Sequence, residues 1–298
     1  MTGHSINEWV IRLTHNDLPI LGRTVREIDR LRANEDRITA KDISSVVLHD
    51  PMMTIKVLRF IQSQRKIGDA EITTIAHALM MLGTGAFFEH FSSGFVTIEE
   101  LLADKPDALH GMLAVVSRSR HAAIYAQDWS LMRHDTESDE VTIAALLHDM
   151  AEMLLWCYLP DELIEIRRRM MRDSSLRSVD TQKAVLGFDL QKLQMLLASI
   201  WKLPSLLRSL MDTDHAKLPR VKNVNIAASF ARHSANGWYN AALPDDFAAI
   251  DSFVSMGAEN VMDYINRNVL VAAREWHWYN FRPAATWLPM LPGEWPVE

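Results

Sequence analysis

Apolar side chains recur every three or four residues along most of this chain, which is the spacing of amphipathic helices. Strict alternation of apolar and polar residues is missing, as are Asn-Gly and Asp-Gly hairpin signals, so strands are not expected. The sequence therefore predicts an all-α protein. The predicted helices cover residues 20–31, 43–47, 51–61, 75–82, 107–129, 144–155, 193–202, 221–233 and 245–274, the last with a break near Gly257.

Helix boundaries are marked by residues that cap or end helices. Thr39 followed by Asp42 indicates one helix start, and Asp50 followed by Pro51 indicates another, because Pro fits the first helical position. Gly83 is typical of a helix end.

The predicted helix over residues 144–155 is almost wholly apolar but carries His148 and Asp149 side by side in its middle. Burying a carboxylate costs free energy unless it is paired, hydrogen-bonded or bound to a metal. The doublet therefore indicates either a metal site or a buried hydrogen-bonded group. A short polar loop joins this helix to residues 107–129, so the two helices should pack together and bring His121 near the doublet.

Composition and charge narrow the class of protein. The chain has 298 residues, 48% of them hydrophobic and 23% charged, which is typical of a globular protein. A net charge of −7 argues against a nucleic-acid binder. A single cysteine, Cys157, suits a reducing compartment, and neither a signal peptide nor a membrane span is evident, so we expect a cytoplasmic protein.

Other candidate residues admit simple structural interpretations. His77 and His90 lack a second metal ligand at helical spacing, so both are expected to be ordinary polar residues on helix faces. The cluster of Arg167, Arg168, Arg169 and Arg172 is interpreted as a solvated face, with phosphate binding as the alternative. The Trp- and Pro-rich tail from residue 236 either covers the protein's own core or contacts a partner or a second copy in a homodimer.

Five segments, in this order, resemble the HDOD family of HD-related output domains in bacterial signalling. They are Leu18–Leu21, Leu48–Arg59 (LHDPMMTIKVLR), Ile75–Gly83 (IAHALMMLG), Leu146–Asp149 (LLHD) and Trp201–Pro204. The resemblance implies an all-α fold of two lobes, over about residues 8–105 and 106–235, followed by a C-terminal extension over 236–298.

The resemblance also implies that the second lobe descends from HD phosphohydrolases, in which two histidines and two aspartates bind a catalytic metal. His121 and the His148–Asp149 doublet match three of these ligands, whereas Ala228 is the best match for the later aspartate. Glu152 stands where those enzymes usually have a lysine, Leu190 replaces a histidine, and a usual His-His pair reads Asp214-His215. Glu152 lies one turn from His148 and could supply an oxygen ligand.

Because several ligands are replaced together, we expect no cofactor, no metal and no catalytic residue. His121, His148 and Asp149 are instead expected to form a buried hydrogen-bonded trio. The predicted function is a non-catalytic signalling module that binds a partner protein or a small ligand. The alternatives are a degenerate metal-dependent phosphohydrolase acting on a nucleotide or cyclic dinucleotide, and a nucleotide receptor using Arg118, Arg120 or the arginines at 167–169.

Overall fold

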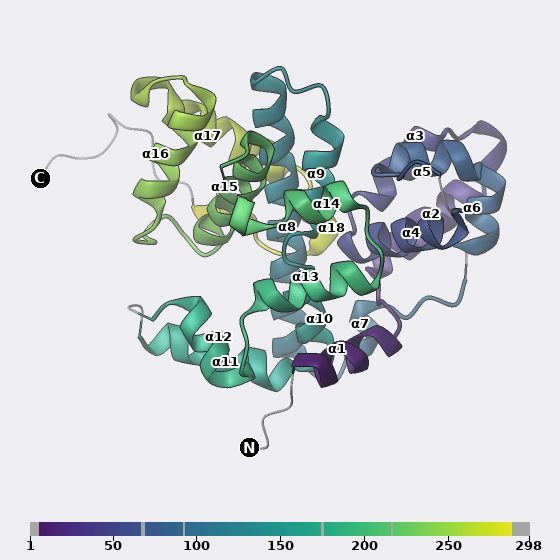
Figure 1. Ribbon diagram of the computed structural model, residues 1–298, viewed down its shortest axis with the longest axis horizontal. Helices are drawn as coiled ribbons and strands as arrows, with labels where there is room; N and C mark the ends of the chain where they lie inside the picture. The colour runs from purple at the N-terminus through teal and green to yellow at the C-terminus, as the bar shows by residue number, and fades with distance from the viewer. Residues whose placement is uncertain (1–5, 67–68, 92, 174–175, 216, 288–298) are drawn as a thin grey trace, which may run out of the picture.

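The computed structural model describes residues 6–66, 69–91, 93–173, 176–215 and 217–287 (Figure 1). In these residues every regular element is a helix, and the backbone pairs as an isolated parallel bridge only between Ile20 and Thr97. The predicted all-α class is confirmed. The α-helices are α1 (Ile6–His15), α2 (Gly22–Arg32), α3 (Ala40–Val47), α4 (Pro51–Gln64), α5 (Ile75–Leu82), α6 (Thr84–His90), α7 (Ile98–Leu101), α8 (Pro106–Met132), α9 (Ser138–Leu147), α10 (Met150–Tyr158), α11 (Pro160–Arg172), α12 (Ser178–Leu186), α13 (Leu190–Ile200), α14 (Ser205–Leu210), α15 (Pro219–Ser234), α16 (Leu243–Val254), α17 (Ala258–Ala273) and α18 (Trp276–Tyr279).

Helices α2 to α6 form a first lobe, seen at the right of Figure 1. The predicted boundaries hold: Thr39 and Asp42 form a reciprocal capping box, and Gly83 ends α5 with a positive φ of 82°. Helix α1 lies outside this lobe and packs against α13.

Asp50 is the polar centre of the first lobe. Its Oδ1 accepts the N–H groups of Met52 and Met53 as the N-cap of α4. Its Oδ2 accepts the N–H of Leu21 at 2.7 Å and the hydroxyl of Thr24 at 2.8 Å. One fully buried carboxylate therefore fixes α2 against the start of α4.

The second lobe is built around α8, which packs against α4, α9, α10, α11, α15, α17 and α18. Small buried side chains let the neighbouring helices approach α8 closely. At Gly111 the approach is closest, because an added Cβ would lie 2.6 Å from the indole ring of Trp156. Larger residues of α8 and α15, including Tyr125, Trp129 and Phe230, complete the core with an aromatic cluster.

The C-terminal extension returns to the junction of the two lobes. Helices α16 and α17 are separated at Gly257, whose φ of 86° confirms the predicted break. In α18, Trp278 stacks on the ring of His49 with centroids 4.1 Å apart. Tyr279 donates its hydroxyl hydrogen to the carbonyl oxygen of His49 at 3.0 Å.

The described tryptophans of the extension differ in how far they are buried, and a contact with a partner or a second copy stays a prediction. Trp278 at the lobe junction and Trp238, which contacts Phe247, cover the protein's own core. Trp276 and Trp287 are 52% and 44% exposed. The part of the tail beyond residue 287 lies outside the described residues.

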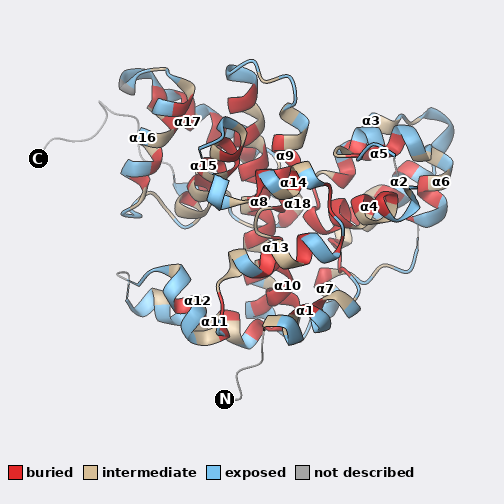
Figure 2. Ribbon diagram, viewed as in Figure 1, coloured by how far each residue is buried: buried red, intermediate tan, exposed pale blue. Residues whose placement is uncertain are grey.

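By length and composition alone, Ser138–Tyr158 is the one stretch of the described chain that could cross a membrane. Of its most apolar window, 78% is buried inside the protein, and core helices commonly meet the same criterion. Figure 2 shows α9 and α10 largely buried among the other helices.

Glu275 links the extension to both lobes and should make the junction sensitive to acid. It binds Arg120 through two hydrogen bonds of 2.7 and 2.9 Å and lies 3.4 Å from Nε2 of His49. Burial opposes ionisation of this carboxyl, but Arg120 and His49 outweigh it and hold its pKa well below the usual range.

Replacing Glu275 by Gln should lower the free energy of unfolding at pH 7 by about 1–3 kcal/mol. A depressed pKa in the folded state stabilises the protein above the unfolded pKa of about 4.3, and this stabilisation is lost as the pH falls below it. The difference between wild type and variant should therefore shrink below about pH 4 in denaturant unfolding. Substitution of the exposed Glu89 by Gln is the control, and a pH-independent difference for Glu275→Gln would contradict the prediction.

Candidate functional site

The His148–Asp149 doublet lies at a helix break and not inside a continuous helix. Helix α9 ends at Leu147 and α10 begins at Met150, so the predicted single helix over residues 144–155 is wrong. Asp149 has φ −105° and ψ 22°, outside helical geometry. The break turns both side chains into a cleft.

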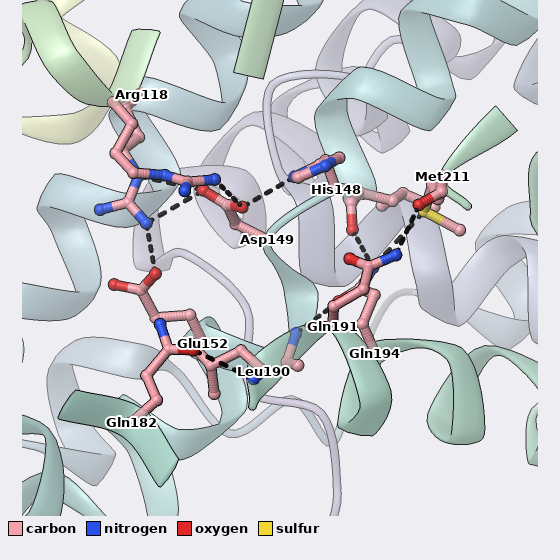
Figure 3. A network of polar contacts seen from close by, with 12 residues as sticks. Arg118, His148, Asp149, Glu152, Gln182, Leu190, Gln191, Gln194 and Met211 are labelled. Carbon is pink, nitrogen blue, oxygen red and sulfur yellow. Dashed lines mark hydrogen bonds and ion pairs between the residues drawn. The ribbon is translucent and has the colours of Figure 1, made fainter. Parts of the chain in front are cut away.

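Gln194 of α13 makes this break possible. In a continuous helix, the N–H of Ala151 would donate to the carbonyl of Leu147. Here the Ala151 N–H donates to Oε1 of Gln194 at 2.9 Å, and Nε2 of Gln194 donates to the Leu147 carbonyl at 2.7 Å. The buried amide of Gln194 thus lies between the N–H of Ala151 and the carbonyl of Leu147 and forms a hydrogen bond with each, as Figure 3 shows in part.

Arg118 of α8 occupies the space in front of the doublet. Its Nε and Nη2 donate to Oδ2 of Asp149 at 3.1 and 3.0 Å, and Nη2 also donates to Oε2 of Glu152 (Figure 3). Oxygens of two carboxylates therefore converge on one guanidinium nitrogen. The side chain of Arg118 is only 14% exposed, and those of Asp149 and Glu152 are 11% and 20% exposed.

Charge pairing favours the ionised forms of Asp149 and Arg118. Burial opposes ionisation of Asp149, but Arg118, Arg232 and a 2.9 Å hydrogen bond from Nδ1 of His148 hold its pKa well below the usual range. Burial also disfavours the charged form of Arg118, but Glu152 and Asp149 raise its pKa further above the ordinary arginine value. The arrangement is a closed ion-pair network.

The network forms part of the wall of a large cleft of about 1430 Å³. Helices α8 and α10 contribute Arg118 and Glu152, and α15 contributes Asn225, Ser229 and Arg232 on a single helical face. The other wall comes from α11, α12 and α13. Figure 2 shows α11 and α12 mostly at the surface, to one side of the buried core.

Comparison with known proteins identifies the fold. A profile of the HDOD domain family matches residues 18–217. The chain belongs to the HDOD family.

Solved structures agree with this assignment. The MmoQ response regulator of Methylococcus capsulatus strain Bath is 17% identical with a TM-score of 0.61, over 83% of this chain and 97% of that chain. A virulence factor of Campylobacter jejuni subsp. jejuni is 18% identical with a TM-score of 0.64, over 95% and 96%. At these identities the likeness establishes the fold alone. No curated protein sequence matches significantly.

The residues of this HDOD protein do not fit the metal site of HD phosphohydrolases. No group of three or more His, Cys, Asp or Glu side chains in the described chain is arranged to hold a metal ion. The carboxylates of Asp149 and Glu152 are both bound by the guanidinium of Arg118, so a metal ion bound there would have to displace Arg118.

The position expected for the later aspartate also differs from the prediction. Ala228 is 4% exposed and does not line the cleft. Asn225 and Ser229 of the same helix line it instead, and neither is a carboxylate. Leu190 and Asp214 line the cleft as well, whereas His215 pairs with Asp212.

Of the predicted hydrogen-bonded trio, His148 and Asp149 do bind each other, but the inclusion of His121 is wrong. His121 is buried, but its Nε2 has no hydrogen-bond partner among the described residues, and Arg118 binds Asp149 instead. His121 matches the family motif, whereas no motif marks Arg118. Arg118 lies one turn earlier on α8, and only packing shows that this turn faces the doublet.

Arg120 was predicted as a ligand-binding residue together with Arg118. It is bound to Glu275 at the lobe junction and does not line the cleft. Of the arginine cluster on α11, only Arg167 lines the cleft, while Arg168 and Arg169 pair with Glu165. His77 and His90 do not line the cleft either: His77 is exposed, and the ring of His90 packs on that of Phe60.

The two hydrogen bonds that Gln194 makes at the helix break should contribute strongly to the free energy of unfolding of the protein. Gln194→Leu leaves one buried donor and one buried acceptor unpaired, at a cost of about 2–4 kcal/mol in the free energy of unfolding. Gln191→Leu is the graded control, because Gln191 donates one such bond, to the carbonyl of Met211. Denaturant unfolding of both variants tests this, and equal losses would contradict the special role of Gln194.

His121 should create a second pH dependence of stability. Burial is the main cause that lowers the pKa of His121 to about 4, from an unfolded value of about 6.5. The unfolded chain then binds more protons between these values, so stability is lost as the pH falls from about 6.5 to 4. The loss from this group should reach about 3 kcal/mol.

The test is denaturant unfolding of His121→Leu across this pH range. The variant should lose this part of the pH dependence, whereas His77→Leu, at an exposed histidine, should retain it. A His121→Leu curve parallel to that of the wild type would refute the prediction.

Proposed function

We propose that this HDOD protein is a non-catalytic signal-transduction module that works in the cytoplasm by binding a partner protein or a small ligand through its cleft. The observation that carries the proposal is the ion-pair network at the doublet. Arg118 neutralises the two carboxylates that would otherwise attract a metal ion, and a metal-activated water is what HD-type hydrolysis requires.

The energetics of buried charges support this proposal. Removing one partner of a buried ion pair costs roughly 3–5 kcal/mol, because the remaining charge is left uncompensated. A metal ion would have to expel Arg118 from Asp149 and Glu152 and leave its guanidinium without partners. The cleft itself remains open beside the network, so binding without hydrolysis is the activity that this geometry favours.

The decisive measurement combines metal content with hydrolysis. The purified protein, supplied with Mn²⁺ or Mg²⁺, is analysed for bound metal and assayed on nucleotides and cyclic dinucleotides. We expect substoichiometric metal and no turnover above that of Asp149→Asn. Stoichiometric metal together with turnover that His148→Ala abolishes would establish the alternative, a phosphohydrolase.

Two further variants separate a structural from a catalytic role of the network. Asp149→Ala should lower the free energy of unfolding by about 3–5 kcal/mol, because it breaks a buried ion pair. Arg118→Ala frees both carboxylates, so its affinity for Mn²⁺ in calorimetric titration should exceed that of the wild type. Equal Mn²⁺ affinities of wild type and Arg118→Ala would show that Arg118 does not control metal binding.

A further inference from the structure

Most acidic groups of the cleft are already engaged within the protein. Of the five carboxylates that line it, Asp149 and Glu152 are bound by Arg118. Asp189 and Asp212 accept backbone N–H groups three and two residues further along, at 2.9 and 3.0 Å. Four of the five carboxylates are therefore already engaged within the protein.

Free donors remain on both walls of the cleft. The side chain of Arg232 is 39% exposed and makes one long contact, 3.5 Å from Nη2 to Oδ1 of Asp149. Arg167 on the opposite wall forms no ion pair within the described part of the chain. Guanidinium groups with unused N–H bonds bind carboxylate and phosphate oxygens well.

The wall opposite Arg232 is aliphatic. Leu163, Ile166 and Met170 follow each other at helical spacing on α11 and line the cleft. Met171 and Val179 extend this wall and are 78% and 45% exposed. Flexible thioether side chains adapt to aliphatic ligands, and covering such a patch removes apolar surface from water.

The three glutamines on this side already make hydrogen bonds within the protein. Gln182 accepts the N–H of Leu190 at 3.2 Å, Gln191 donates to the Met211 carbonyl, and Gln194 fills the helix break. Nucleobase edges need hydrogen-bond partners, whereas an aliphatic chain needs none.

We propose that the cleft binds an anionic amphiphile, a phosphate or carboxylate group on an aliphatic chain. Arg232 holds the anion, and the chain lies along Leu163, Met170 and their neighbours on α11 and α12. This proposal rests on the non-catalytic function proposed above and names the class of ligand for the same cleft.

Calorimetric titration with hexyl, octyl and decyl phosphate, all below their micelle-forming concentrations, tests the proposal directly. Affinity should rise roughly fourfold for each added CH₂, the gain expected from burying a methylene. Decanoate distinguishes a carboxylate from a phosphate head group. Inorganic phosphate, the neutral octyl glucoside and AMP should each bind at least about tenfold more weakly than decyl phosphate.

Variants locate the site. Arg232→Gln should weaken decyl phosphate roughly tenfold or more, and Arg232→Lys should recover part of the loss. Arg168→Gln is the matched control, because Arg168 is 53% exposed and paired with Glu165, and its affinity should equal that of the wild type. Met170→Gln should reduce the rise in affinity that each added CH₂ of the alkyl phosphate produces. Thermal unfolding of each variant establishes that it folds.

The outcomes separate this inference from the proposed function. Affinity that is independent of chain length, tighter binding of AMP, absence of binding, or equal effects of Arg232→Gln and Arg168→Gln would each overturn the inference alone. Release of inorganic phosphate from decyl phosphate, measured in the same samples, would instead overturn the non-catalytic function. Chain-length-dependent binding without phosphate release supports both.

Discussion

The guanidinium of Arg118, held between two carboxylates, is the contact on which the candidate site depends. The side chains of Asp149 and Glu152 are mostly buried, 11% and 20% exposed, and an unpaired buried charge is costly in free energy. A metal ion is one way to compensate two such carboxylates, and a tethered cation from a neighbouring helix is another. In this chain the guanidinium of Arg118 compensates both carboxylates.

The backbone next to this contact is interrupted between α9 and α10. Helices α9 and α10 are separated where the side chain of Gln194 takes the place of a backbone hydrogen bond between Ala151 and Leu147. The break carries Asp149 out of helical geometry and towards Arg118 and Arg232. A residue of α13 that touches neither the cation nor the carboxylates thus determines where the carboxylate lies.

The C-terminal extension places a third element between the lobes. Glu275 and Trp278 contact Arg120 and His49, while Phe281 a few residues later lines the cleft and packs on His110. The same short segment therefore touches the lobe junction and the candidate binding site. This segment is therefore a physical connection between the cleft and the lobe junction.

Features that depend on local interactions could be predicted from the amino-acid sequence. The all-α class, the caps at Thr39 and Asp50 and the breaks at Gly83 and Gly257 follow from spacing, capping chemistry and backbone freedom within a few residues. The ordered motifs also indicated the HDOD family. Other features became visible only in the folded protein. Helices α9 and α10 separate, and Arg118 instead of His121 contacts Asp149. Asn225 and Ser229 line the cleft whereas Ala228 does not, and Arg120 lies at the lobe junction. Each of these depends on the rotation of one helix against another, which is set by side chains far apart in the chain and leaves no local signal in the sequence.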